Sequence, residues 1–240
     1  MAMPFHSALD WLDDRTGYRA LLHHLLEEPI PSGVGWFFTL GALLLGLLAT
    51  QATTGIVLML YYVPTPDHAW DSVRFVIDRV TFGRVIRNLH AFGASAIVIV
   101  AALHLLRVFF FGSYKRPREV TWITGVLLLL VIMGFALTGY LLPWDQRAYW
   151  ATVVTLNIAR SAPLAGEFVA SVMRGGAELG ALTLSRWYAV HVIVLPLTLL
   201  GLVGAHLYLM RRHRISGPIT PTPTTTSGSC CGSKDSSNGR

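Results

Sequence analysis

Four long apolar segments dominate the pattern of hydrophobic and polar positions along this 240-residue chain. Charged residues are concentrated between these segments or at their ends. About 20 consecutive apolar residues are enough for a helix to cross the hydrocarbon core of a bilayer. We therefore predict an all-α integral membrane protein, an up-and-down bundle of four transmembrane helices at about residues 33–62, 85–111, 121–142 and 187–210.

The segments outside these four helices have distinct patterns. Residues 1–32 repeat apolar positions at helical spacing between charges, which fits either a helix on the membrane surface or a soluble helix that contacts a partner. Residues 143–186 are too long for an ordinary loop and contain two amphipathic stretches, 149–158 and 164–173, so we predict a helical hairpin. Residues 216–240 are rich in Pro, Thr, Ser and Gly and predict an extended or partner-bound tail. The membrane domain is accordingly expected at residues 33–215.

Composition supports the membrane assignment. Hydrophobic residues make up 53% of the chain and charged residues only 13%, against about 25% charged in soluble proteins. The net charge of +6 comes from residues at the ends of apolar segments, which argues against a nucleic-acid partner. Basic residues cluster at 107–118 and 211–214 and predict that both termini lie on the cytoplasmic side, called the n-side below. The opposite side is called the p-side.

The second and fourth apolar segments each carry two histidines. His90 and His104 are fourteen residues apart, and His191 and His206 are fifteen apart. Such spacings return to nearly the same helix face after roughly 21 to 22 Å. One membrane histidine could merely hydrogen-bond a neighbouring helix, but four at matched depths indicate a function. Because these two helices run parallel, we predict that His90 pairs with His191 on the p-side and His104 with His206 on the n-side. Each pair would supply both axial ligands of a haem iron.

Glycines repeat on the other two helices with the same period. The pairs are Gly41 with Gly55 and Gly125 with Gly139, each fourteen residues apart. A glycine lets a flat macrocycle approach the backbone closely, which is the role we predict. Small residues also serve helix–helix packing in membranes, and that alternative stays open.

Arginines flank all four histidines at the predicted membrane boundaries. A guanidinium group suits a haem propionate because its planar donors match a carboxylate. Each arginine could instead extend its charged group to the interface or set topology. The four candidates are Arg87, Arg107, Arg186 and Arg211.

The chain resembles the N-terminal, haem-binding half of cytochrome b, in the split form found in chloroplast-type b–f complexes. The resemblance covers roughly residues 10 to 218, and the fifteen-residue gap between His191 and His206 also matches this short form. The matching motifs are Asp10-Trp11-Leu12-Asp13-Asp14-Arg15, Thr54-Gly55, Lys115-Arg116-Pro117-Arg118-Glu119, Pro143-Trp144-Asp145-Gln146, Tyr149-Trp150-Ala151, Ser185-Arg186-Trp187-Tyr188 and Ile215-Ser216-Gly217-Pro218.

The resemblance implies a subunit of a quinol-oxidising, proton-translocating complex with two b-type haems. Quinol would be oxidised on the p-side, and electrons would pass to a Rieske iron–sulfur protein and a c-type cytochrome, or through both haems to quinone on the n-side. A bacterial cytoplasmic membrane and a dimeric complex are expected. A p-side quinone pocket would include Pro143, Trp144, Asp145 and Tyr149.

Three departures from the resembled family bear on function. The Pro-Glu-Trp-Tyr quinol-site motif is missing, so we expect a separate subunit with the C-terminal half of cytochrome b and no activity of this chain alone. Thr39 occupies the position of the cysteine that attaches a third haem in chloroplast-type relatives, so no covalent third haem is expected. His23 and His24 replace acidic residues and could serve proton uptake or be a solvated pair.

Two other functional classes remain open at this stage. The first is a dihaem b-type membrane anchor of a dehydrogenase or hydrogenase. The second is a channel or assembly protein with structural histidines. The adjacent Cys230 and Cys231 have no metal-binding or haem-attachment spacing and are expected to be simple tail thiols.

Overall fold

The computed structural model describes residues 5–20, 23 and 35–213. Within these ranges the chain is helical, without strands, and the predicted fold class is confirmed. Four helices are long and apolar enough to cross a membrane. Their bounds are α3 Leu40–Met59, α5 Gly83–Phe110, α6 Glu119–Leu141 and a continuous span Ala181–His213 that contains α9 and α10.

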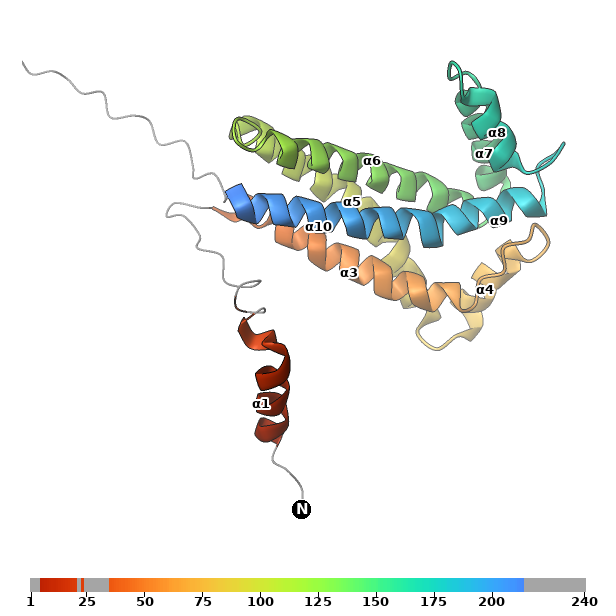
Figure 1. Ribbon diagram of the computed structural model, residues 1–240. Helices are drawn as coiled ribbons and strands as arrows, with labels where there is room; N and C mark the ends of the chain where they lie inside the picture. The colour runs from red at the N-terminus through yellow and green to blue at the C-terminus, as the bar shows by residue number, and fades with distance from the viewer. Residues whose placement is uncertain (1–4, 21–22, 24–34, 214–240) are drawn as a thin grey trace, which may run out of the picture.

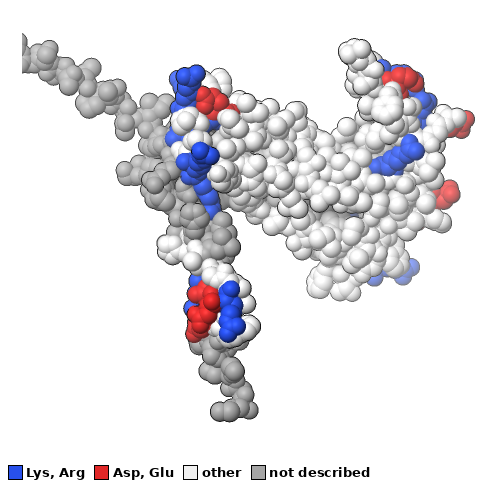
Figure 2. Space-filling model, viewed as in Figure 1, with Lys and Arg blue, Asp and Glu red and all other residues white. Residues whose placement is uncertain are grey.

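The four spans lie side by side along their length (Figure 1). Each is apolar on most sides, and at most 11% of the most hydrophobic stretch of each span is buried within the chain. Large side chains such as Ile99, Leu130 and Leu200 remain 60% or more exposed. Figure 2 shows an uncharged belt between two charged ends. A helix that is hydrophobic all round requires an apolar surrounding, so the bundle is an integral membrane domain.

Two spans differ in extent from the sequence prediction. The first begins at Leu40, after a 3₁₀ turn at Trp36–Phe38, whereas the prediction began at residue 33. The fourth begins at Ala181, six residues before the predicted start. The residues before Trp187 alternate polar and apolar, so apolarity alone did not identify them as part of the span.

The fourth span is α-helical at both ends and has a π turn in its first half. α9 (Ala181–Ala189) continues into the π turn Val190–Val194 and then into α10 (Leu195–His213). The amide of Leu195 donates to the carbonyl of Val190, the five-residue bond that defines this turn. A π turn holds one more residue than an α turn, and it lies immediately before the predicted kink residue Pro196.

Three shorter helices lie at one end of the bundle (Figure 1). α4 (Ala69–Arg79) was not predicted; it buries Ala69, Ser72 and Val76 and contacts α5. α7 (Gln146–Arg160) and α8 (Gly166–Arg174) form the hairpin between the third and fourth spans. Asp145 caps α7 by accepting a hydrogen bond from the amide of Ala148 at 2.8 Å.

A compact apolar cluster fastens the hairpin to the spans. Leu141, Leu156 and Trp187 are buried together at the junction of α6, α7 and α9. Beside it, the Tyr62 hydroxyl donates to the carbonyl of Leu142 at 2.5 Å. Burial raises the pKa of the Tyr62 phenol, so the group stays a neutral donor. This end of the bundle is therefore held by defined contacts.

The N-terminal segment contains α1 (Phe5–Thr16), drawn apart from the bundle in Figure 1. α1 ends at Gly17, whose φ of 61° favours glycine. Most of residues 21–34, including His24 and the prolines that end the predicted helix, lies outside the described residues. The predicted tail with Cys230 and Cys231 also lies outside them.

Candidate functional site

The four membrane histidines lie on two facing helices, α5 and the fourth span. His90 on α5 faces His191 in the π turn, with ring centres 6.4 Å apart and ring planes at 72°. His104 lies fourteen residues further along α5, against Gly41 of α3, and His206 of α10 lies against Gly125 of α6. The structure thus brings His90 and His191 together, and it places His104 and His206 at a second level of the same two helices.

Three of these imidazoles contact a threonine hydroxyl on a neighbouring helix. The distances from Oγ1 to Nδ1 are 3.0 Å for Thr54 with His90, 2.9 Å for Thr124 with His206, and 2.8 Å for Thr138 with His191. Sequence reasoning gave none of these threonines a role, although Thr54-Gly55 was among the matching motifs. Each directly precedes one of the glycines singled out above, so a Thr-Gly pair repeats at three of the four positions. The fourth position is Leu40-Gly41, beside His104.

The hydrogen bonds of these hydroxyls determine which imidazole nitrogen carries the proton. Each threonine donates its single proton to a carbonyl of its own helix, as Thr54 does to Thr50 at 2.7 Å and Thr138 to Gly134 at 2.8 Å. A hydroxyl that has donated its proton can only accept a further hydrogen bond. With the hydroxyl proton on the helix carbonyl, Nδ1 of His90, His191 and His206 is the donor in these three contacts. The lone pair on Nε2 is then available to a metal.

The glycines lie directly against the imidazoles. A Cβ built on Gly55 would be 3.1 Å from Cε1 of His90, and one on Gly139 would be 2.9 Å from Cε1 of His191. At the other level, Gly41 and Gly125 stand against His104 and His206 at 3.5 and 3.3 Å. The glycines thus leave space for the histidine rings themselves. The space for a macrocycle that their spacing suggested stays a prediction.

An apolar layer separates the two histidine levels. Ile97, halfway between the two histidines of α5, is buried with Ala101 and Ile132. The leucines packed around them are Leu44, Leu47, Leu48 and Leu129. This apolar packing between the two histidine levels has a low local dielectric constant.

A glutamine in the middle of α3 supports one of the histidines. The Gln51 amide donates from Nε2 to the backbone carbonyl of His90 at 3.0 Å. Gly93 of α5 makes this contact possible, because a Cβ there would lie 2.2 Å from Gln51 Nε2. The sequence analysis did not identify Gln51, although a polar amide inside an apolar span indicates an interhelical bond.

Comparisons with known proteins identify the family of this chain. The family model described as Cytochrome b/b6/petB matches residues 25–214. The chain belongs to the cytochrome b/b6 family. It is 42% identical over 218 residues to the menaquinol:cytochrome c reductase cytochrome b subunit of Geobacillus thermodenitrificans, covering 88% of this chain and 97% of that protein. It is 40% identical over 213 residues to cytochrome b6 of Heliobacterium mobile, covering 88% and 100%.

A solved structure shows the same likeness. A chain of the structure titled "Hyperthermophilic respiratory Complex III" matches with a TM-score of 0.79 and 34% identity over 91% of this chain. The match covers 59% of that longer chain, so the present chain spans about three fifths of its length. The predicted resemblance to cytochrome b is confirmed.

The separation of His90 and His191 in this cytochrome b/b6 chain fits an iron held between two imidazoles. Imidazole nitrogen binds a metal at about 2.0 Å and the ring centre lies roughly 1.2 Å further, so two rings on one metal have centres about 6.4 Å apart. The centres of His90 and His191 are 6.4 Å apart. The described residues contain no group of three or more His, Cys, Asp or Glu that could hold a metal ion alone. A planar group that needs only two axial ligands fits this donor set.

The arginines of this cytochrome b/b6 chain occupy two different environments. Arg107 stacks on Phe38 at 3.7 Å, and its Nε and one terminal nitrogen are buried without a hydrogen-bond partner in the described part of the chain. Arg186 instead donates to the carbonyl of Val172 at the end of α8. Arg87 is half-buried and donates to Asn88 at 3.3 Å, and Arg211 lies in the last turn of α10. Arg107 is thus the best placed of the four to bind a carboxylate.

The residues expected in the quinone pocket lie at and just before the start of α7. Trp144 has a positive φ of 53° and packs edge-on against Tyr149, with ring centres 5.9 Å apart. Asp145 uses its carboxylate as the cap of α7. Tyr149 also lines the cavity between α7 and the segment that links α8 to α9.

Proposed function

We propose that this chain is the dihaem cytochrome b subunit of a membrane quinol:cytochrome c oxidoreductase or a b6f-type complex. It would connect a quinol-oxidising site on the p-side to a quinone-reducing site on the n-side and thereby contribute to proton translocation. A haem iron with two imidazole ligands supplies a one-electron carrier that has no open coordination position for oxygen.

The proposal rests on the threonine–imidazole contacts. Two histidine pairs lie on α5 and the fourth span, and three of the four rings place Nδ1 within hydrogen-bond distance of a buried or half-buried threonine hydroxyl. Such outer partners fix the tautomer and orientation of metal-binding histidines. Structural histidines of a channel or assembly protein would not need Nε2 to be kept free in this way.

The remaining side chains support the same assignment. The four glycines leave space for the rings, and the layer around Ile97 and Ile132 keeps the two levels apart. Arg107 would bind a propionate with its unpaired nitrogens, and we assign Arg87, Arg186 and Arg211 to the same role at the other membrane boundaries. Thr39 donates to the carbonyl of Trp36 at 2.7 Å and carries no thiol, which supports the absence of a covalent third haem.

Partners and orientation follow from the same family assignment. The chain would assemble with a subunit carrying the C-terminal half of cytochrome b, a Rieske protein and a c-type cytochrome, in a dimeric complex of the bacterial cytoplasmic membrane. Basic residues around the α5–α6 connection and the last turn of α10 support an n-side location of these ends. The α7–α8 hairpin would then lie on the p-side, where Pro143, Trp144, Asp145 and Tyr149 would form part of a quinone pocket wall.

Substitution of one histidine per level tests the proposal. His206→Leu in the assembled complex should abolish the n-side haem and preserve the p-side α-band, because the two levels share no ligand. His191→Leu should do the reverse. Reduced-minus-oxidised spectra and a redox titration measure both effects. Equal loss of both bands, or a wild-type complex without any b-type band, would contradict the proposal. A dihaem complex that reduces quinone but contains no Rieske protein would instead indicate a dehydrogenase or hydrogenase anchor.

A further inference from the structure

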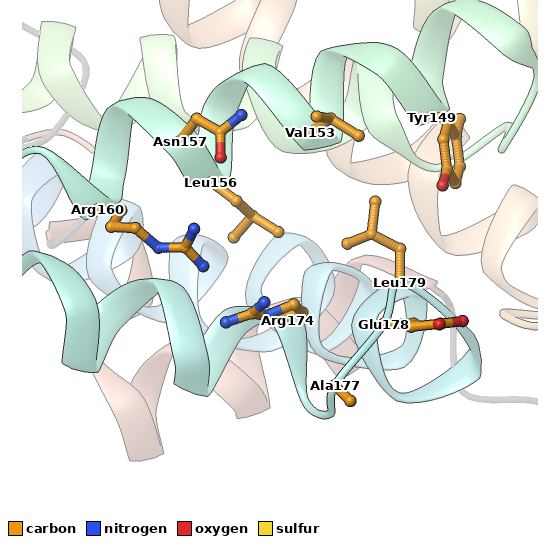
Figure 3. A pocket seen from close by; sticks show the side chains of 9 residues that line it. All are labelled: Tyr149, Val153, Leu156, Asn157, Arg160, Arg174, Ala177, Glu178 and Leu179. Atoms are coloured by element: carbon orange, nitrogen blue, oxygen red, sulfur yellow. The ribbon is translucent and has the colours of Figure 1, made fainter.

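A cavity of about 300 Å³ lies between α7 and the segment that links α8 to α9. Figure 3 shows its nine lining side chains, and none of them is a histidine of the two pairs. Val153, Leu156 and Leu179 supply apolar walls. The cavity is therefore distinct from the histidine levels, although Tyr149 lies at its edge.

Two arginines line one end of this cavity. Arg160 ends α7 and Arg174 ends α8 (Figure 3). Arg160 uses its Nε in an ion pair with Glu167 at 2.8 Å, which leaves its two terminal nitrogens for other partners. Nε of Arg174 is buried without a hydrogen-bond partner, and the described residues offer its guanidinium group no ion pair. Two like charges that face one cavity indicate a site for an anion.

The other end of the cavity carries a negative charge. Glu178 lies next to Leu179 in Figure 3, away from the two guanidinium groups. Among the described residues its carboxylate forms no ion pair. The cavity therefore has a positive end and a negative end with apolar walls between them. Free phosphate would satisfy only the positive end, whereas a zwitterion would satisfy both.

The location of the cavity fits a lipid. α7 and α8 lie at one end of the spanning helices (Figure 1), at a charged end of the uncharged belt (Figure 2). α8 exposes Phe168 and Val172 one turn apart, at 72% and 44% exposure, as expected of a helix at a membrane surface. A phospholipid bound here could place its headgroup in the cavity and its acyl chains in the belt.

We propose that this cavity binds a phospholipid with an ethanolamine-type headgroup. The phosphodiester would lie between Arg160 and Arg174, and the ammonium group would lie at Glu178. Neither group is needed for binding haem, so this inference does not depend on the proposed function.

Lipid retention by the full-length, haem-loaded chain in detergent tests the proposal. The chain is delipidated, exposed to an equimolar mixture of phosphatidylethanolamine and phosphatidylglycerol, and analysed by native mass spectrometry. We expect one retained phosphatidylethanolamine. Arg174→Gln should weaken retention about tenfold or more, the loss expected for one charge-assisted contact. Arg147→Gln is the matched control, because Arg147 is exposed on the same hairpin and does not line the cavity.

A second measurement separates the headgroup from a free anion. Titration calorimetry with dihexanoyl phosphatidylethanolamine and with inorganic phosphate should give binding only for the lipid, and Arg174→Lys should retain more of it than Arg174→Gln. Helical content and haem spectra verify that each variant is folded. Three results would overturn the assignment: equal retention by the wild type and Arg174→Gln, preference for phosphatidylglycerol, or binding of phosphate without the lipid.

Discussion

Replacing Thr54 by valine removes the hydroxyl that accepts a hydrogen bond from His90 while keeping the size of the side chain. Thr54 Oγ1 lies 3.0 Å from Nδ1 of His90 and donates its own proton to the carbonyl of Thr50. The valine variant therefore removes this contact from the Nδ1 side of the His90 ring. Thr54 is 8% exposed, so water has little access to take the place of the hydroxyl.

The expected effects on metal affinity and on the reduction potential follow from the energy of that hydrogen bond. A buried donor that loses its partner costs about 1–3 kcal/mol, and loss of an outer partner of a metal-binding histidine lowers metal affinity about 10- to 100-fold. The bond also raises the basicity of the imidazole, which favours the more positively charged ferric iron. If about 1 kcal/mol of the bond distinguishes the two oxidation states, the reduction potential of the p-side haem rises by roughly 40 mV, since 59 mV is a tenfold change for one electron.

The assay is a redox titration of both α-bands in the purified complex. Thr53→Val is a matched control, because Thr53 donates to the carbonyl of Ala49 at 2.9 Å and is exposed on the other side of α3. Thr54→Ser restores the acceptor and should restore the potential. The tautomer argument is refuted if Thr54→Val leaves the p-side potential equal to that of Thr53→Val, or if both haems shift by the same amount.

Three further substitutions test neighbouring contacts. Gly139→Ala places a Cβ 2.9 Å from His191, so the p-side haem should be partly lost, whereas Gly134→Ala on the same helix meets only Leu195 at 3.5 Å and should leave the spectrum unchanged. Gln51→Leu removes the donor to the His90 carbonyl and should lower the free energy of unfolding by about 0.6–1.5 kcal/mol, measured by thermal unfolding in detergent; an unchanged melting temperature would contradict this role. Leu40→Thr should give His104 the partner that the other three histidines have and lower the n-side potential by roughly 40 mV, whereas no shift would show that the added hydroxyl does not reach the ring.

Much of the fold could be predicted because a helix that crosses a membrane must be apolar along most of its length. The four spans stand out in the sequence, since each must cover about 30 Å of hydrocarbon. Their ends were less certain, because the start of the fourth span mixes Ser185 and Arg186 with apolar residues. α4 was missed because the face it buries consists of Ala69, Ser72 and Val76, which give only a weak apolar stripe.

The candidate site was only partly predictable from the sequence. Histidines at matched depths stand out because polar residues are costly inside a membrane. Threonine does not stand out there, because its hydroxyl can bond to its own helix, as Thr138 does to Gly134. Only the packing of α6 against the fourth span shows that the same hydroxyl also accepts from His191. The recurring Thr-Gly pair was the available signal.

The unequal histidine spacings have a physical explanation that only the backbone provides. At about 100° per residue, an interval of fifteen residues turns His206 roughly 100° further than an interval of fourteen would. On a regular α-helix that interval would carry His206 about 60° past the face of His191, whereas the fourteen-residue interval on α5 stops about 40° short of four full turns. The π turn at Val190–Val194 takes up the additional residue, so the fifteen-residue interval makes nearly the same number of turns as the fourteen-residue interval on α5. Pro196 cannot donate the α-helical bond that would close a regular turn here, which favours the wider one. The additional residue, the π turn and the proline therefore act together to keep both histidines of the fourth span facing α5.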